Sequence, residues 1–325
     1  MRVRGFHELK ERLHLATPNP QEIARVKAMG FLHNRGTDTF SARAVGKNGT
    51  MSADQLATLA RCAEKYGNGR VCFTSRLTVE MPGVHLEDVE NIRRDVESVG
   101  LIIGGTGAKI RPLTACKGTT CVYGNADTQG ICADLYDTFF TGWADVTLPH
   151  KFKIAVGGCP NSCMKPSLND FGIEAHRLPV YDMEKCRGCK KCFIGERCPM
   201  HAIHVEDGKM HVSEDVCTKC GVCIEKCPFG VTLPVSEPVF ALYVGGTWGK
   251  HTRMGTRLPR FYSREELEPM IEKTLLWFKD NAYKKERLGA AIDRVGVDAF
   301  IAAVEGDGLL ARKADILAAP VKERA

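Results

Sequence analysis

Residues 148–166 read LPHKFKIAVGGCPNSCMKP, which places two lysines, a glycine pair and two cysteines close together. In an extended strand, residues two apart share a face. Lys151 and Lys153 then point to one side, while Phe152 and Ile154 point into a core. An ordinary half-buried strand with a solvated basic face shows the same alternation, so the lysines alone leave both interpretations open. The cysteines have to decide between them.

The composition is typical of a soluble globular protein with two or three domains. The chain has 325 residues, of which 44% are hydrophobic and 26% are charged, and its formal net charge is +6. A chain of this length can bury several cores. We expect no membrane span and no secretory signal, because no stretch has the necessary apolar length and the basic N-terminal stretch has no apolar centre. The net charge is too small to indicate nucleic-acid binding. Without a signal or a membrane span, we expect a cytoplasmic protein.

Cysteine is the unusual component. The chain has 15 cysteines, and most of them lie between residues 116 and 227. In a cytoplasmic chain, clustered cysteines are more often metal ligands or redox groups than disulfide partners. Cys62, Cys72 and Cys132 fall outside any motif, and we expect them to be small buried hydrophobic side chains.

The N-terminal part predicts a compact α+β unit. The expected elements are a strand at 39–45, a helix at 53–66, two strands within 70–81, a helix at 86–99 and a strand at 101–103. This β-α-β-β-α-β order is the ferredoxin-like arrangement. The arrangement by itself says little about function.

Helix starts also leave signals in the sequence. Ser52 with Gln55, and Ser263 with Glu266, form capping boxes. The second box predicts a helix to about residue 279, and a further helical run lies within 126–140. We assign the buried face of the helix at 53–66 to Leu56, Leu59, Ala60 and Ala63.

The densest cysteine block predicts two [4Fe–4S] clusters. CRGCKKCFIGERCP and CTKCGVCIEKCP supply four cysteines each, with a longer loop before the last cysteine of the first motif. In two-cluster ferredoxins, three cysteines of one motif are joined by the last cysteine of the other. We therefore assign Cys186, Cys189, Cys192 and Cys227 to one cluster, and Cys217, Cys220, Cys223 and Cys198 to the other. Four-cysteine zinc sites are the alternative.

Two separated cysteine pairs outside this block can hold a third cluster. TACKGTTCVYG supplies Cys116 and Cys121, and GGCPNSCMKP supplies Cys159 and Cys163. Taken alone, the two pairs would also fit a zinc site or buried structural thiols.

The pairs and their neighbouring segments resemble the sirohaem-containing sulfite and nitrite reductases. In that family the two pairs hold a cubane, and the last cysteine, here Cys163, also bridges the cubane to the sirohaem iron. GRVCFTSRLTVEMPGV, IRPLTAC, LPHKFKIAV and the closing GGTWGKHTRMGTRLPRF are similar to family segments. The resemblance implies that Arg76, Arg111, Lys151 and Lys153 surround the open face of the haem, where they bind the anionic substrate and supply protons. The lysine strand would then face a cofactor, with substrate and cluster on either side of it.

The resemblance covers approximately residues 39–275 and implies a fold. It consists of a ferredoxin-like N-terminal half at 1–110, a sirohaem and [4Fe–4S] α/β domain at 111–180 and 231–325, and an inserted 2[4Fe–4S] ferredoxin domain at 181–230. His150 stands where the family has an arginine. Arg43 and Lys47 are candidates for contacts with haem carboxylates or for ordinary solvation.

The layout is most similar to the small anaerobic sulfite reductases, including the C subunit of the three-part anaerobic enzyme. The chain carries one copy of the ferredoxin-like half and haem domain, where long assimilatory enzymes carry two. A symmetric partner would supply the second copy, so we expect a homo-oligomer.

The resemblance implies a sulfite reductase that takes sulfite to sulfide with six electrons, using sirohaem and three [4Fe–4S] clusters. Electrons would arrive through the two ferredoxin-type clusters. The chain has no flavin or nicotinamide motif, so we expect a ferredoxin or an electron-donating partner subunit to supply them. Nitrite reduction to ammonia on the same cofactor, and a non-catalytic electron-transfer subunit, are the alternatives. The four cations argue against the second alternative, because a carrier needs no anion pocket.

Overall fold

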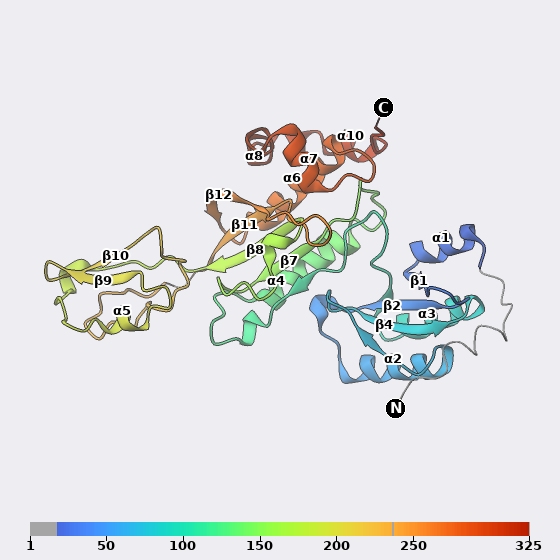
Figure 1. The fold of residues 1–325 in the computed structure, drawn as a ribbon, viewed down its shortest axis with the longest axis horizontal. Helices are drawn as coiled ribbons and strands as arrows, with labels where there is room; N and C mark the ends of the chain where they lie inside the picture. The colour runs from blue at the N-terminus through green and yellow to red at the C-terminus, as the bar shows by residue number, and fades with distance from the viewer. Residues whose placement is uncertain (1–17, 236, 325) are drawn as a thin grey trace. The chain divides into compact units, whose positions relative to one another are not determined.

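The chain divides into two compact units between residues 107 and 108, close to the expected boundary at residue 110. The computed structural model describes residues 18–235 and 237–324 (Figure 1). The expectation of no secretory signal falls mainly on residues 1–17, outside the described part. Among the described residues, no helix has both the length and the apolar character that crossing a membrane requires.

The first unit has the expected ferredoxin-like order. Its elements are α1 (Pro20–Ala28), β1 (Phe31–His33), β2 (Phe40–Val45), α2 (Ala53–Tyr66), β3 (Cys72–Phe73), β4 (Val79–Val84), α3 (Val89–Glu97) and β5 (Ile102–Ile103). The strands run in the order β1-β2-β4-β3, and β5 pairs with β2 beside β1. From β2 to β5 the order β-α-β-β-α-β confirms the prediction.

Helix α2 begins as predicted and buries two of the four residues assigned to its core face, Leu59 and Ala63. The Ser52 and Gln55 capping box is formed: Ser52 N donates to Gln55 Oε1 over 2.9 Å, and Gln55 N donates to Ser52 Oγ over 3.1 Å. Leu56 and Ala60 are exposed, so assigning them to the core was wrong. The buried positions are Thr58, Leu59, Cys62, Ala63 and Tyr66.

The second unit is built on a five-stranded mixed sheet. Its strands are β6 (Thr114–Ala115), β7 (Ile154–Gly157), β8 (Phe171–His176), β11 (Val239–Val244) and β12 (Thr256–Tyr262), in the order β12-β11-β8-β7-β6. β6, β7 and β8 are parallel, whereas β11 and β12 are antiparallel to their neighbours. The carboxyl ends of β6 and β7 therefore meet at one edge of the sheet.

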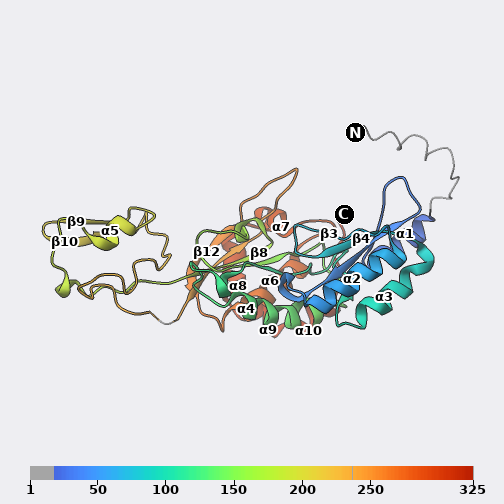
Figure 2. The ribbon, with the colours of Figure 1, turned by 90° about the horizontal axis from the view of Figure 1, so that it is seen from below.

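Helices cover this sheet (Figure 2). They are α4 (Thr128–Leu135), continued by a π-turn (Tyr136–Thr141), then α6 (Leu267–Asn281), α7 (Leu288–Val295), α8 (Val297–Glu305), α9 (Gly308–Ala311) and α10 (Lys313–Ala318). Phe278 of α6 packs on Phe152, with ring centroids 6.1 Å apart. The second predicted capping box is only half formed: Ser263 N donates to Glu266 over 2.8 Å, and α6 begins one turn later than expected.

A small lobe separates β8 from β11. It contains α5 (Phe193–Arg197), β9 (Ile203–Glu206) and β10 (Lys209–Val212), and Figure 1 shows it extending from the end of β8. Its core is small, with Ile194, Ile203, Met210 and Val231 buried and several cysteines packed around them. We call residues 181–230 the insert.

Candidate functional site

Four cysteines gather where β6 and β7 end. Cys116 directly follows β6, and Cys159 lies two residues beyond β7. Burial raises the pKa of the Cys159 thiol, an Asn161 backbone N–H lowers it, and the nearby Cys116, Cys163 and Cys121 thiols raise it further. The Sγ of Cys116 accepts a hydrogen bond from Gly158 N over 3.2 Å. The other three thiols predicted to hold the cubane thus lie close enough to Cys159 to raise its pKa.

The N-terminus of α4 fixes the loop that carries Cys116 and Cys121. Asp127 caps α4 by accepting a hydrogen bond from Gly130 N over 2.9 Å, and it also accepts one from the Thr119 hydroxyl over 2.6 Å. Both bonds stabilise the carboxylate and lower the pKa of Asp127, the Thr119 bond having the larger effect. Thr128 and Gln129 donate to the carbonyl of Cys116 over 2.8 and 3.1 Å. The cysteine loop is therefore tied to the first turn of a helix.

The insert brings its eight motif cysteines together as two sets of four. One cavity is lined by Cys186, Cys189, Cys192 and Cys227. A second cavity, beside Tyr181, is lined by Cys198, Cys217, Cys220 and Cys223. We call these the outer and inner quartets; they have the same membership as the two predicted ligand sets. Backbone N–H groups of Met210 and Ala202 donate to the sulfurs of Cys186 and Cys198 over 3.3 and 3.4 Å.

These thiol sets suit an iron–sulfur cluster in their donor chemistry. In the described part of the chain, no three or more His, Cys, Asp or Glu side chains form a group that could hold a single metal ion. A four-iron cluster takes one thiolate at each corner, and N–H groups aimed at the sulfurs are a usual part of its surroundings. The outer and inner quartets each have the donor number and chemistry of such a cluster.

The predicted cations Arg111, Lys151 and Lys153 lie at the other end of the same strands. Arg111 N donates to Phe152 O over 2.8 Å, and Phe171 N donates to Lys153 O over 2.9 Å. These residues precede β6 and β7, whereas the cysteines follow them. The regular strand begins at Ile154 rather than at Lys151, and Phe152 and Ile154 are fully buried as expected.

A buried carboxylate, Asp170, holds the backbone of Lys153. Asp170 has no exposed surface, and both of its oxygens lie 2.9 Å from Arg287 Nη2. One oxygen also accepts a hydrogen bond from Lys153 N over 2.9 Å. A buried carboxylate of this kind needs a partner charge, and Arg287 provides a forked one. The sequence did not indicate Asp170 or Arg287 as site residues.

The surroundings of Arg287 and Arg111 lower the pKa values of His150 and Lys151. Burial, followed by the charges of Arg287, Lys151 and Arg111, lowers the pKa of His150 to about 4. His150 is therefore neutral at pH 7, and its Nδ1 accepts a hydrogen bond from Lys151 N over 2.7 Å. Burial and the charges of Arg287 and Arg111 also lower the pKa of Lys151. An ammonium group in these surroundings gives up its proton more readily than a solvated one.

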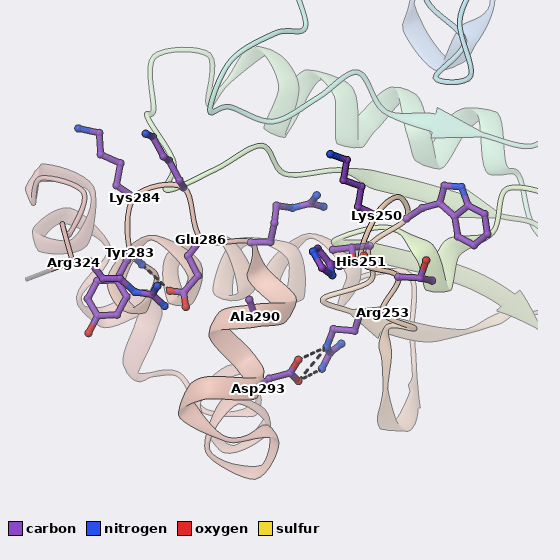
Figure 3. A pocket seen from close by; sticks show the side chains of 14 residues that line it. Lys250, His251, Arg253, Tyr283, Lys284, Glu286, Ala290, Asp293 and Arg324 are labelled. Atoms are coloured by element: carbon purple, nitrogen blue, oxygen red, sulfur yellow. Dashed lines mark hydrogen bonds and ion pairs between the residues drawn. The ribbon is translucent and has the colours of Figure 1, made fainter.

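A cavity of about 790 Å³ opens beside Arg287 (Figure 3). Its two acids are neutralised, because Asp293 pairs with Arg253 over 2.7 Å and Glu286 pairs with Arg294 over 2.8 Å. Its walls are otherwise strongly basic and come from the loop after β11, the segment after α6, helix α7 and Arg324. The basic lining residues are Lys250, His251, Arg253, Lys284, Lys285, Arg287 and Arg324. The runs KHTR and YKKER were the available sequence signals for this cavity.

The remaining candidates have different surroundings. Arg76 lies in the first unit, in the turn between β3 and β4, where its backbone N donates to Thr74 Oγ1 over 3.3 Å. Arg43 is bound to Glu80 by contacts of 2.6 and 2.9 Å, so it is not simply solvated, and its contact with haem carboxylates stays a prediction. Cys62 and Cys132 are buried as predicted, but Cys72 is exposed, and that prediction was wrong.

Known families match both units. The "Nitrite and sulphite reductase 4Fe-4S domain" matches residues 106–308, which is most of the chain. The chain belongs to the nitrite and sulphite reductase family. The family's "Nitrite/Sulfite reductase ferredoxin-like half domain" matches residues 33–99, in agreement with the fold of the first unit.

Relatives within this family carry sulfite reductase names. The chain is 32% identical to the coenzyme F420-dependent sulfite reductase of Methanocaldococcus jannaschii over 85% of its own length but only 44% of that protein. It is 27% identical to the C subunit of the anaerobic sulfite reductase of Salmonella typhimurium, over 78% of this chain and 77% of that one. A crystal structure of dissimilatory sulfite reductase I has the same fold, with a TM-score of 0.66 and 21% identity over 82% of this chain and 69% of that one.

Proposed function

We propose that this family member is a sirohaem-dependent sulfite reductase that takes sulfite to sulfide with six electrons. The observation that carries the proposal is the group of cations at the amino ends of β6 and β7, next to the basic cavity. Sulfite is a small oxyanion, and sirohaem is fringed with carboxylates. Both require fixed cations, for which arginine forks and lysines are suited.

Sirohaem and three [4Fe–4S] clusters would supply the electrons and the metal centre for breaking S–O bonds. We assign the cubane to Cys116, Cys121, Cys159 and Cys163, with Cys163 as the bridge to the haem iron. We assign the remaining clusters to the outer and inner quartets. The cations of the cavity would bind the haem carboxylates.

Within the site, Lys151, Lys153 and Arg111 would hold the anion and donate the protons that the departing oxygens take up. The lowered pKa of Lys151 makes its ammonium group a readier proton donor than that of a solvated lysine. Asp170 and Arg287 would fix the backbone of Lys153. Neutral His150 adds no further positive charge. Arg76 is proposed as the fourth cation on the family resemblance alone.

The positions of cations and cysteines also support a homo-oligomer. At about 3.3 Å per residue, the extended stretch from Lys151 to Gly157 is about 20 Å long. Lys151 therefore lies a whole strand away from the cysteines that follow Gly157. A haem would have Cys163 on one face and the lysines on the other. Because one chain keeps these residues far apart, the cysteines and the lysines at one haem would come from different copies of the chain. We propose that each site combines the cysteines of one copy with the cations of its partner.

The outer quartet is the proposed docking region for an electron donor. Arg187 lies over the ring of Phe229 at 4.5 Å, and Arg197 lies over that of Phe193 at 3.6 Å. Both phenylalanines are exposed, as are Lys190 and Lys191. A basic surface with aromatic groups suits an acidic ferredoxin or partner subunit. We place the reaction in the cytoplasm, where thiols remain reduced.

An anaerobic assay of the purified chain tests the proposal. The absorption spectrum and the iron and acid-labile sulfide contents come first, followed by oxidation of reduced methyl viologen with sulfite or nitrite. We expect a sirohaem spectrum, iron for three clusters and haem, and faster oxidation with sulfite. Faster oxidation with nitrite would favour nitrite reduction. Iron for two clusters without a haem band, after production with sirohaem available, would reduce the chain to an electron carrier.

A further inference from the structure

We infer that Asn125 is the contact through which the inner quartet of the insert delivers electrons to the four cysteines at the ends of β6 and β7. This inference rests on the proposed cluster assignments. It adds an order to them, in which the outer quartet receives electrons and the inner quartet passes them on. It also names one residue on which that last transfer depends.

Asn125 is buried between the insert and the sheet. Only 9% of its surface is exposed, although it lies in a loop. Its side-chain Nδ2 donates to the carbonyls of Cys220 and Ala175 over 3.3 and 3.4 Å. A buried amide is expected to have such partners, and here one partner belongs to an inner-quartet cysteine and the other to β8.

The backbone of Asn125 continues the contact towards the other cysteines. Asn125 N donates to Gly158 O over 2.8 Å. Gly158 N in turn donates to the Sγ of Cys116 over 3.2 Å. Three hydrogen bonds and the covalent bonds between them thus connect Cys220 with the Cys116 sulfur. Electrons cross proteins faster through such bonded contacts than across gaps between side chains.

The insert is fixed to the sheet on the same side. Arg177 and Cys220 form an isolated parallel β-bridge, and Arg177 N donates to Lys219 O over 3.0 Å. His176 Nδ1 lies 2.9 Å from Thr218 O. All three insert residues belong to the inner-quartet motif. The outer quartet lines a separate cavity, which none of these contacts reaches. The inner quartet is therefore the one that is attached to the sheet.

The transfer itself is a single-electron exchange. The cluster on the inner quartet would lose one electron and return to its oxidised form, and the cluster on Cys116, Cys121, Cys159 and Cys163 would gain that electron. The outer quartet's cluster would then re-reduce the inner one, with a low-potential donor supplying the electron. In the test below, that donor is the reduced methyl viologen radical.

The test compares Asn125→Leu with the wild-type holoprotein. Leucine has a similar branched shape but cannot donate to Cys220 O. After rapid mixing with reduced methyl viologen without sulfite, freeze-quench EPR follows the reduced insert clusters, and absorption follows sirohaem reduction. We expect the insert clusters to be reduced at the wild-type rate and sirohaem about tenfold more slowly, which is about 1.4 kcal/mol in the barrier. Unchanged sirohaem reduction in a variant with full iron content would overturn the inference.

Asn281→Leu is the matched control. Asn281 also donates through its amide to a carbonyl, Trp277 O at 3.0 Å, but within α6. We expect wild-type rates for both steps in this variant. If Asn125→Leu loses iron, Asn125→Ala provides a smaller replacement for the same comparison.

A second measurement needs no change at Asn125. In the partly reduced wild type, paramagnetic sirohaem should speed the relaxation of one insert-cluster EPR signal more than the other. Cys217→Ser should alter the faster-relaxing signal and Cys189→Ser the slower one. The reverse assignment would overturn the proposed order. A wild-type protein without sirohaem, or without sulfite-dependent oxidation, would instead refute the proposed function, so the two failures are distinguishable.

Discussion

Lys153 is held through its backbone by a buried charge pair. Its N–H is bound by fully buried Asp170, whose other partner is Arg287. The main chain at Lys153 is therefore fixed by a charge pair next to the proposed anion site. The lysine and the carboxylate that holds it are the basis of two predictions.

Lys153→Met should leave the haem spectrum largely intact and lower sulfite turnover by about a hundredfold or more, the usual contribution of a positioned acid. Methionine keeps the length of the side chain but removes its charge and proton. The measurement is viologen-linked sulfite reduction at saturating sulfite, with spectrum and iron content recorded on the same sample. Lys313→Met, at a surface pair with Glu272, should retain full activity. Full activity of Lys153→Met would show that the anion site is misplaced.

Asp170→Asn should destabilise the second unit by about 3 kcal/mol, because Arg287 would keep its charge without a buried partner. Urea unfolding followed by tryptophan fluorescence measures the effect. Glu323→Gln, which removes the exposed partner of Lys284, is the control and should change stability by less than about 0.5 kcal/mol. Equal midpoints for the two variants would mean that the Asp170 pair contributes no more than a surface pair.

Local alternation predicted that Phe152 and Ile154 are buried, but it could not predict what holds Lys153 between them. Arg287 is 117 residues beyond Asp170, and no local pattern connects them. The same limit applies to the cavity, whose walls come from segments on either side of α6. Cysteine spacing, in contrast, is a local property, and it predicted the same two sets of four that line cavities in the insert.

At the scale of elements, the start of α2 was easier to predict than its buried face. The start follows from a capping box, which is local in sequence. Its buried face depends on where the sheet lies, and Tyr66 and Cys62 turn inward in place of Leu56 and Ala60. The start of β7 was similarly placed early, because alternating residues 151–153 are extended without forming a regular ladder.

Helix α4 connects such a local signal to the cysteines. Asp127 binds both the first turn of α4 and Thr119 of the cysteine loop, so Asp127→Ala should cost about 1 kcal/mol of stability and reduce the iron content. Thermal unfolding and iron analysis measure the two effects. Asp54→Ala, an exposed first-turn change in α2, is the control. Normal stability and iron content in Asp127→Ala would show that the Asp127 cap supports neither the helix nor the cysteine loop.

The Asp127 cap also has a pH dependence of known sign. Its folded pKa is lowered, so its stabilising effect is complete above the ordinary carboxyl pKa and is lost as pH falls through the folded value. The stability difference between wild type and Asp127→Ala should therefore shrink below about pH 4. An unchanged difference at lower pH would contradict this assignment.

At the scale of the whole molecule, the strand that carries the lysines also keeps them away from its own cysteines. If each site combines two copies, two different inactive variants should restore one another. Lys153→Met lacks the cation but keeps its cysteines, and Cys163→Ala has the opposite defect. In a symmetric dimer containing one of each, one site has both defects and the other has neither. The mixed dimer should then have roughly half of wild-type activity.

Co-expression of the two variants with different affinity tags, followed by sequential purification, isolates the mixed dimer for this measurement. Each variant expressed alone provides the background activity, and a mixture of the two purified variants, combined without exchange of protomers, provides the control. Activity in the mixed dimer well above both backgrounds would mean that cations and cysteines act across the interface. Activity no higher than background, with full sirohaem content at the intact cysteines, would place the whole site within a single chain.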